Sequence, residues 1–97
     1  LIVGHTDDRP IAGRETRQKY PNNWHLSAAR ALVVADFLDS RGIGERRLGV
    51  IGLGRHEPVS LNESSQGRQS NRRVEVYVVE PDIPLIGWND FITPLYR

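Results

Sequence analysis

The sequence predicts a small α/β protein, an α+β two-layer sandwich in which one long helix covers one face of a small sheet. The chain has 97 residues, which suffices for one domain with one hydrophobic core. Apolar residues make up 38% and charged residues 26%, as in soluble globular proteins. Segments typical of a strand, a helix and two further strands follow one another, and this order favours the two-layer arrangement.

The first predicted strand covers residues 1–5, an apolar run that ends in polar residues. Residues 8–21 follow and contain two prolines and a glycine, so we interpret them as a surface loop. Loops of this length often carry function. We therefore expect the chemistry of this protein at the carboxyl end of the first strand, around Asp7.

A helix is predicted over residues 24–41, which are rich in alanine and leucine and lack glycine and proline. Asn22 and Asn23 are suitable N-cap residues, and Gly42 supplies a C-terminal stop. Arg30 interrupts the apolar side of this helix and therefore needs an anionic partner. The predicted apolar stripe, at a spacing of three and four residues, consists of Leu26, Val33, Val34, Phe37 and Leu38.

Two further strands are predicted. Residues 47–53 alternate partly and are β-branched at Val50 and Ile51, and residues 74–79 have strong β propensity. A short helical turn over residues 66–72 precedes the last strand. We assign residues 1–79 to the domain. Residues 80–97 contain three prolines and show no usable periodicity, so we interpret them as a C-terminal extension.

Composition excludes several classes of function. Thirteen basic and twelve acidic side chains give a net charge of +1, which is too balanced for nucleic-acid binding. The chain has no cysteine, so disulfides and thiolate metal sites are excluded. No apolar run is long enough to span a bilayer, and we expect membrane attachment only through segments outside this chain. The abrupt apolar start suggests a fragment of a longer protein.

Asp7 and Arg30 are the leading candidates for a binding site. In a compact strand-loop-helix unit, Asp7 lies near the start of the helix that carries Arg30. An acceptor for an ammonium beside donors for a carboxylate is the complement of a free amino-acid end. The alternative is that the two side chains form an internal salt bridge, and residue chemistry alone leaves both interpretations open.

Metal binding and catalysis have weaker support. His5 and Asp7 share one face of a strand, and His25 and His56 could join them, but no helix carries a paired-histidine motif. Ser27 lies within a helix without a nucleophile-elbow sequence. We therefore expect no metal, no cofactor and no enzymatic activity.

Several motifs together resemble the OmpA-like peptidoglycan-binding domain, a βαβαββ fold, and the resemblance covers residues 1–79. The similarity implies a periplasmic module that holds the diaminopimelate residue of the peptidoglycan stem. The motifs are Gly4-His5-Thr6-Asp7, Asn23, Leu26-Ser27, Arg30-Ala31, Gly52, Gly54, Pro58, Gly67-Arg68 and Asn71-Arg72-Arg73-Val74-Glu75.

The resemblance implies ligand-binding roles for Asp7 and Arg30, for the helix-capping Asn23 and for Arg72, together with Thr6 and Leu26. The long loop and Asn23-Trp24 are similar to the MotB-type flagellar stator branch, in which a membrane-anchored parent binds the cell wall and the domain dimerises. The family's first strand and first helix are absent from this sequence. An alternative is an assembly module that forms a homodimer, with the Asp7–Arg30 pair as an internal salt bridge.

Overall fold

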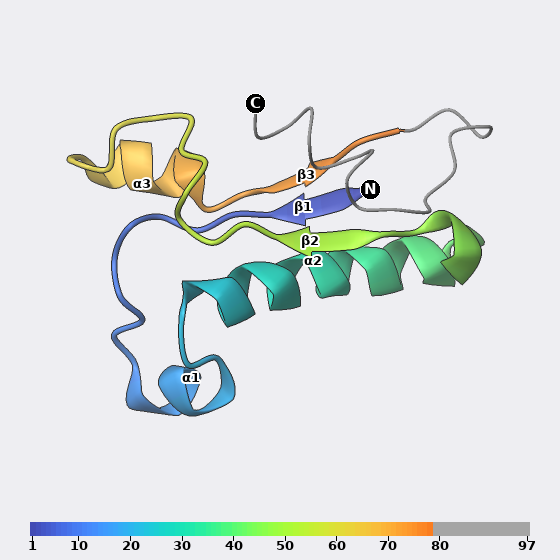
Figure 1. Ribbon diagram of the computed structural model, residues 1–97, viewed down its shortest axis with the longest axis horizontal. Coiled ribbons are helices and arrows are strands. Elements are labelled where there is room, and N and C mark those ends of the chain that lie inside the picture. The colour runs from blue at the N-terminus through green and yellow to red at the C-terminus, as the bar shows by residue number, and fades with distance from the viewer. Residues whose placement is uncertain (79–97) are drawn as a thin grey trace.

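Three short strands form a sheet with one long helix packed against one face. A computed structural model of the chain describes residues 1–78. Strands β1 (Ile2–Gly4), β2 (Val50–Gly52) and β3 (Val74–Val76) lie in the order β2-β1-β3. β1 is parallel to β2 and antiparallel to β3. The predicted two-layer α/β arrangement is confirmed (Figure 1).

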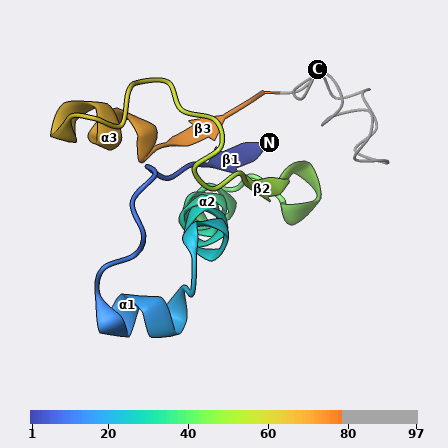
Figure 2. The same ribbon diagram turned by 60° about the vertical axis from the view of Figure 1, so that its left-hand side comes forward.

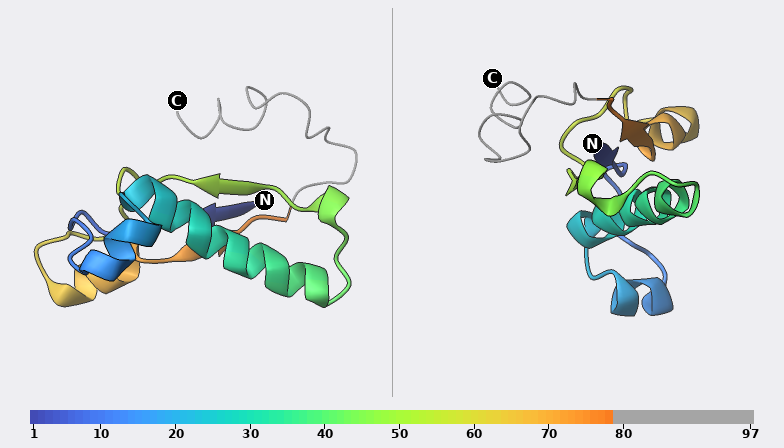
Figure 3. Two further views of the ribbon diagram at one scale, coloured as in Figure 1. Left: turned by 90° about the horizontal axis from the view of Figure 1, so that it is seen from below. Right: turned by 90° about the vertical axis from the view of Figure 1, so that its right-hand side faces the viewer.

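The helices differ in how closely they approach the sheet. Helix α2 (Asn23–Ser40) runs along the sheet, whereas α1 (Arg14–Lys19) projects away from it (Figure 2). Helix α3 (Ser65–Asn71) lies beyond the end at which β1 leaves the sheet, and the 3-10 helix η1 (Glu45–Arg47) lies near the opposite end (Figure 3). The start of α2 and the whole of α3 therefore lie at the same end of the sheet, the end at which β1 leads to Asp7.

Glycines on two strands allow α2 to pack directly on the sheet. Gly4 and Gly52 are register partners on β1 and β2. A Cβ atom at Gly4 would lie 1.9 Å from the carbonyl oxygen of Ser27, and one at Gly52 would lie 2.7 Å from the amide nitrogen of Ala28. No side chain fits at either position without displacing the helix. The helix backbone therefore rests on the strand backbones at Ser27.

The predicted apolar stripe of α2 is partly wrong. Val33 and Phe37 are 69% and 54% exposed, and the buried helix residues are Ser27, Ala31 and Ala35. Small side chains face the sheet because the backbones approach so closely, and the large apolar side chains extend to the neighbouring side of the helix. Leu26, Val34 and Leu38 are half-buried, and of these Val34 and Leu38 pack against the core of Ile2, Ala31 and Ala35.

Other boundaries differ in detail. The predicted loop over residues 8–21 contains α1, whose side chains are all exposed, so no apolar pattern marked it. Residue 47 belongs to η1, and the second strand begins only at Val50. The turn predicted over residues 66–72 is α3, and the last strand ends at Val76. Residue 79 and the extension 80–97 lie outside the described residues.

The second face of the sheet, opposite α2, carries its own apolar cluster. Val3, Ile51 and Leu53 are buried there, and Leu1 packs against them.

Within residues 1–78, no helix is long and apolar enough to cross a membrane.

Candidate functional site

Asp7 is buried just beyond the carboxyl end of β1 and is held by neighbouring residues. It is 8% exposed. Its Oδ2 lies 2.6 Å from Nη1 of Arg72, and its Oδ1 accepts a hydrogen bond from the backbone amide of Arg9 at 3.0 Å. The ion-pair partner of Asp7 is thus Arg72, which lies 65 residues further along the chain. The alternative of an internal salt bridge between Asp7 and Arg30 is wrong, because the described residues show no such pair.

Arg30 and Arg72 meet around a shallow depression between α2 and the start of β3. This depression has a volume of about 460 Å³ and is lined by Arg30, Val33, Arg72, Arg73 and Val74. The side chain of Arg72 is 40% exposed, so it can contact a ligand while it remains paired with Asp7. Arg30 makes no ion pair within residues 1–78. The structure therefore brings Asp7, Arg72 and Arg30 to one location.

Asn23 supports the loop after β1 and does not cap the helix. The N-cap is Asn22, whose side chain accepts from the His25 amide at 3.1 Å, so the prediction that Asn23 caps is wrong. The Asn23 amide donates instead to the carbonyls of Asp7 at 3.4 Å and Arg9 at 3.2 Å. Of the two adjacent asparagines, only one is needed as the cap, and the other closes the Asp7 loop.

Thr6 and Leu26 have different relations to this site. Thr6 is 3% exposed, and its hydroxyl donates to the Asp7 carbonyl at 2.9 Å. It therefore fixes the backbone that presents Asp7. Leu26 is half-buried on α2 and does not line the depression around Arg30 and Arg72.

Asn71 is a structural part of the site that was not predicted from the sequence. It is fully buried at the end of α3, directly before Arg72. Its Oδ1 accepts from the amides of Val59 and Ser60 at 2.8 and 3.0 Å, and its Nδ2 donates to the Ser60 carbonyl and to Asn62 Oδ1 at 3.0 and 2.8 Å. These hydrogen bonds fix the backbone from which Arg72 reaches Asp7. The signal in the sequence was its place in the motif Asn71-Arg72-Arg73-Val74-Glu75, which did not indicate a structural role for the asparagine.

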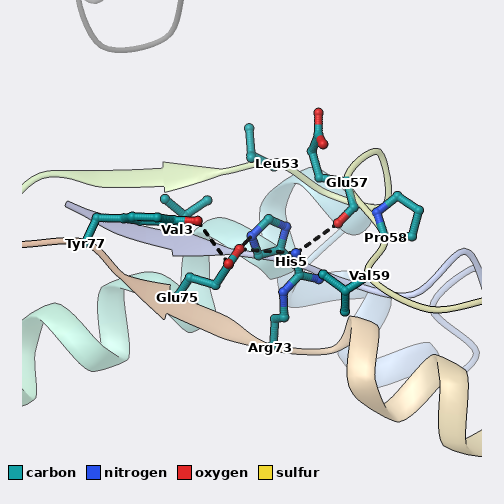
Figure 4. Close-up of a pocket in the computed structure, with 9 residues that line it drawn as sticks. All are labelled: Val3, His5, Leu53, Glu57, Pro58, Val59, Arg73, Glu75 and Tyr77. Atoms are coloured by element: carbon teal, nitrogen blue, oxygen red, sulfur yellow. Dashed lines mark hydrogen bonds and ion pairs between the residues drawn. The ribbon is translucent and has the colours of Figure 1, made fainter. Parts of the chain in front are cut away.

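A second pocket lies on the sheet face opposite α2 and contains a polar cluster (Figure 4). His5 Nε2 lies 2.5 Å from Glu75 Oε1, and Arg73 Nη2 donates to the same oxygen at 3.1 Å. The hydroxyl of Tyr77 donates to Glu75 Oε2 at 3.0 Å. The cluster joins β1 to the β3 segment. Figure 4 shows the three partners converging on the Glu75 carboxylate.

The protonation state of this cluster follows from its surroundings. Burial and the nearby charge of Arg73 lower the pKa of His5, and the carboxylate of Glu75 offsets this only in part. Burial opposes ionisation of Glu75, but the hydrogen bond from Tyr77 and the charge of Arg73 outweigh it and lower its pKa. At neutral pH the cluster therefore holds a neutral imidazole, a carboxylate and a guanidinium, which suits a structural role.

The three histidines do not converge on one point. His5 contacts Glu75, His25 contacts Asn22 through Nδ1 at 2.8 Å, and His56 stacks on Trp24. Within residues 1–78, no group of three or more histidine, aspartate or glutamate side chains could hold a metal ion.

Asp7, Arg72 and Arg30 supply one carboxylate and two guanidinium groups, although Asp7 itself does not line the depression. A carboxylate has about four lone-pair positions, and neighbouring residues use two of those on Asp7, so acceptor capacity remains. The two guanidinium groups offer planar donor pairs that match a carboxylate. The arrangement therefore suits a small zwitterion or the end of a chain that carries both charges.

Comparisons with known proteins agree on one family. The sequence profile of the OmpA family matches residues 1–72. Motility protein B of Bacillus subtilis is 36% identical over 80 residues, which are 81% of this chain and 29% of that protein. The peptidoglycan-binding protein ArfA of Mycobacterium tuberculosis is 45% identical over 77 residues, which are 79% of this chain and 21% of that protein.

A solved structure extends the agreement to the fold. The cell wall anchor of the T6SS from Pseudomonas aeruginosa superposes with a TM-score of 0.64 at 43% identity, over 76% of this chain and 50% of that chain. The chain thus spans less than a third of the length of these two relatives and half of this solved structure.

Proposed function

Because this chain belongs to the OmpA family, we propose that it binds peptidoglycan non-covalently and without catalysis, through the diaminopimelate residue of the peptide stem. The observation that carries the proposal is the convergence of Asp7, Arg72 and Arg30 at one end of the sheet. Diaminopimelate ends in a carbon that bears both an ammonium and a carboxylate. These charges match the carboxylate and the two guanidinium groups of the site.

The ammonium of the ligand is assigned to Asp7. Its carboxylate is already oriented by Arg72 and by the Arg9 amide, so binding does not require a search among side-chain rotamers. Burial of Asp7 lowers the local dielectric and strengthens the attraction to an ammonium. A charge-assisted hydrogen bond contributes about 1.5–3 kcal/mol.

The carboxylate of the ligand is assigned to Arg30 and Arg72. The two side chains reach the same depression from α2 and from the segment before β3. Arg72 then contacts both Asp7 and the ligand, and it couples the ammonium-binding and carboxylate-binding parts of the site. We call Asp7, Arg30 and Arg72 together the Asp7 clamp. A ligand that lacks the carboxylate leaves two cationic side chains unpaired, and this is the basis of the proposed specificity.

The remaining predicted residues have supporting roles in this proposal. Asn23 and Thr6 hold the Asp7 loop through its carbonyl, and Leu26 follows Asn23 by three residues on α2, where it is half-buried. The relative ArfA is named for peptidoglycan binding, and the T6SS neighbour is named as a cell wall anchor. We therefore propose that the domain works in the periplasm of the cell envelope, as the wall-binding part of a larger membrane-anchored protein.

Binding to purified diaminopimelate-type sacculi tests the proposal. Asp7→Asn keeps the shape of the side chain but removes its charge, and Arg30→Gln removes the charge on α2. Each variant is expected to lose roughly 10- to 100-fold in affinity. The control is Arg46→Gln, which removes an exposed charge on η1 at the other end of the fold. Equal sedimentation of all four proteins with sacculi contradicts the proposal.

A further inference from the structure

A stacked aromatic pair lies on the surface beside the Asp7 site. The ring of Trp24 lies over the ring of His56, with centroids 4.9 Å apart and planes inclined by 27°. Trp24 is 51% exposed although it is the largest side chain of α2, and His56 is also exposed. Stacking covers one face of each ring, and the exposure of Trp24 leaves part of its aromatic surface open to solvent. Neither the Asp7 clamp nor the core uses it.

The pair is fixed to the same framework as Asp7. The Ser27 hydroxyl donates to the Trp24 carbonyl at 2.9 Å and accepts from the Gly54 amide at 3.0 Å. The Gly54 carbonyl accepts from the Thr6 amide at 2.9 Å, one residue before Asp7. Gly54 has a φ of 62°, and a Cβ there would lie 3.5 Å from the Trp24 ring. The turn after β2, the start of α2 and the Asp7 loop therefore form one braced unit.

The surroundings of the pair indicate what kind of ligand it suits. The residues adjacent in sequence to both rings are polar; Asn23 is half-buried, and His25, Arg55 and Glu57 are exposed. A stable protein interface buries about 1,200–2,000 Å² and has an apolar centre. Two rings within a polar rim are too small a patch for such an interface. A flat aromatic surface with hydrogen-bonding neighbours matches a sugar ring, which has apolar C–H faces and hydroxyl groups around its edge.

We propose that Trp24 and His56 bind a saccharide ring of the glycan strand that carries the peptide stem. This inference rests on the proposed function, because it assigns the stem to Asp7 and the adjoining glycan to the aromatic pair. The domain then contacts two chemically different parts of one polymer, charged groups at Asp7 and a carbohydrate face at Trp24. Gain in affinity from the second contact requires no change in the clamp.

The test compares two soluble ligands by calorimetry on the 97-residue chain. One is a diaminopimelate-containing stem peptide, and the other is the same peptide attached to its disaccharide. The wild-type protein is expected to bind the disaccharide-peptide about 5-fold or more tightly than the peptide, since one aromatic stacking contact supplies an effect of this size. Trp24→Ala and His56→Ala are each expected to remove most of this difference and to leave peptide binding unchanged.

The controls separate this inference from the proposed function. Equal wild-type affinity for both ligands, with peptide binding that still depends on Asp7, overturns the saccharide site alone. A Trp24→Ala variant that weakens both ligands equally also overturns it, because the side chain then acts on the fold or the clamp. His56→Ala keeps the test valid if Trp24→Ala unfolds, since His56 lies in an exposed turn. Failure of the wild-type protein to bind either ligand overturns both proposals.

Discussion

Gly4→Ala is expected to destabilise the fold strongly, because α2 rests on the backbone of β1 at this position. The added Cβ would lie 1.9 Å from the carbonyl oxygen of Ser27, and that atom belongs to helix backbone that cannot move alone. Ordinary contacts begin at about 3.4 Å, so α2 must shift by more than about 1 Å relative to β1. Overpacking of this kind costs about 3 kcal/mol.

Thermal unfolding followed by circular dichroism measures this effect. A cost of about 3 kcal/mol lowers the Tm of a domain of this size by roughly 12–24 °C. The matched control is Gly44→Ala, because a Cβ at Gly44 meets nothing within 4 Å and its φ of −64° suits alanine. The control is expected to change Tm little or to raise it. A Gly4→Ala protein as stable as the control refutes the direct packing of α2 on β1, and with it the placement of Arg30 relative to Asp7.

Three further predictions concern the residues around the site. Asn71→Ala is expected to cost about 2–3 kcal/mol in urea unfolding, because it leaves two part-buried amides and a carbonyl without partners, whereas exposed Gln69→Ala is expected to stay within about 0.5 kcal/mol. Arg72→Lys keeps the charge but loses the planar donor pair, so calorimetry with the stem peptide is expected to show about 10-fold weaker binding, and an unchanged Kd contradicts the shared role of Arg72. The pKa of His5 is lowered in the folded state, so the unfolded chain binds more protons and stability is expected to fall as pH drops below the ordinary histidine value of 6.5. Urea unfolding between about pH 7.5 and pH 5 measures this slope, and an equal slope in His5→Gln contradicts the assignment.

The order of elements was predictable because local signals mark it. Two asparagines and a glycine bracket α2, so its predicted bounds agree within one residue at each end. The left-handed φ of Gly42, 97°, confirms the predicted stop. Helix α1 was not predicted, because a helix without a buried side has no apolar periodicity in its sequence. Its arginine, glutamate, glutamine and lysine are all good helix formers, and propensity alone was too weak a signal.

The site was predictable only in part. Asp7 and Arg30 were selected by their positions after a strand and on an apolar helix side. The partner of Asp7 could not be read from local pattern, because Arg72 is distant in sequence and three consecutive polar or basic residues, 71–73, compete for that role. The structure separates them: Asn71 is buried at the end of α3, Arg72 faces Asp7 and Arg73 faces Glu75. Both arginines precede β3, and their side chains pair with different carboxylates.

The comparison of two stem peptides tests the central claim most directly. One peptide contains diaminopimelate, and the other contains lysine, which has the same ammonium but lacks the neighbouring carboxylate. We expect the wild-type protein to bind the diaminopimelate peptide roughly 100-fold more tightly, because only this ligand pairs with both Arg30 and Arg72. We also expect Arg30→Gln to reduce that preference sharply. Equal affinity of the wild-type protein for the two peptides would contradict the proposed clamp.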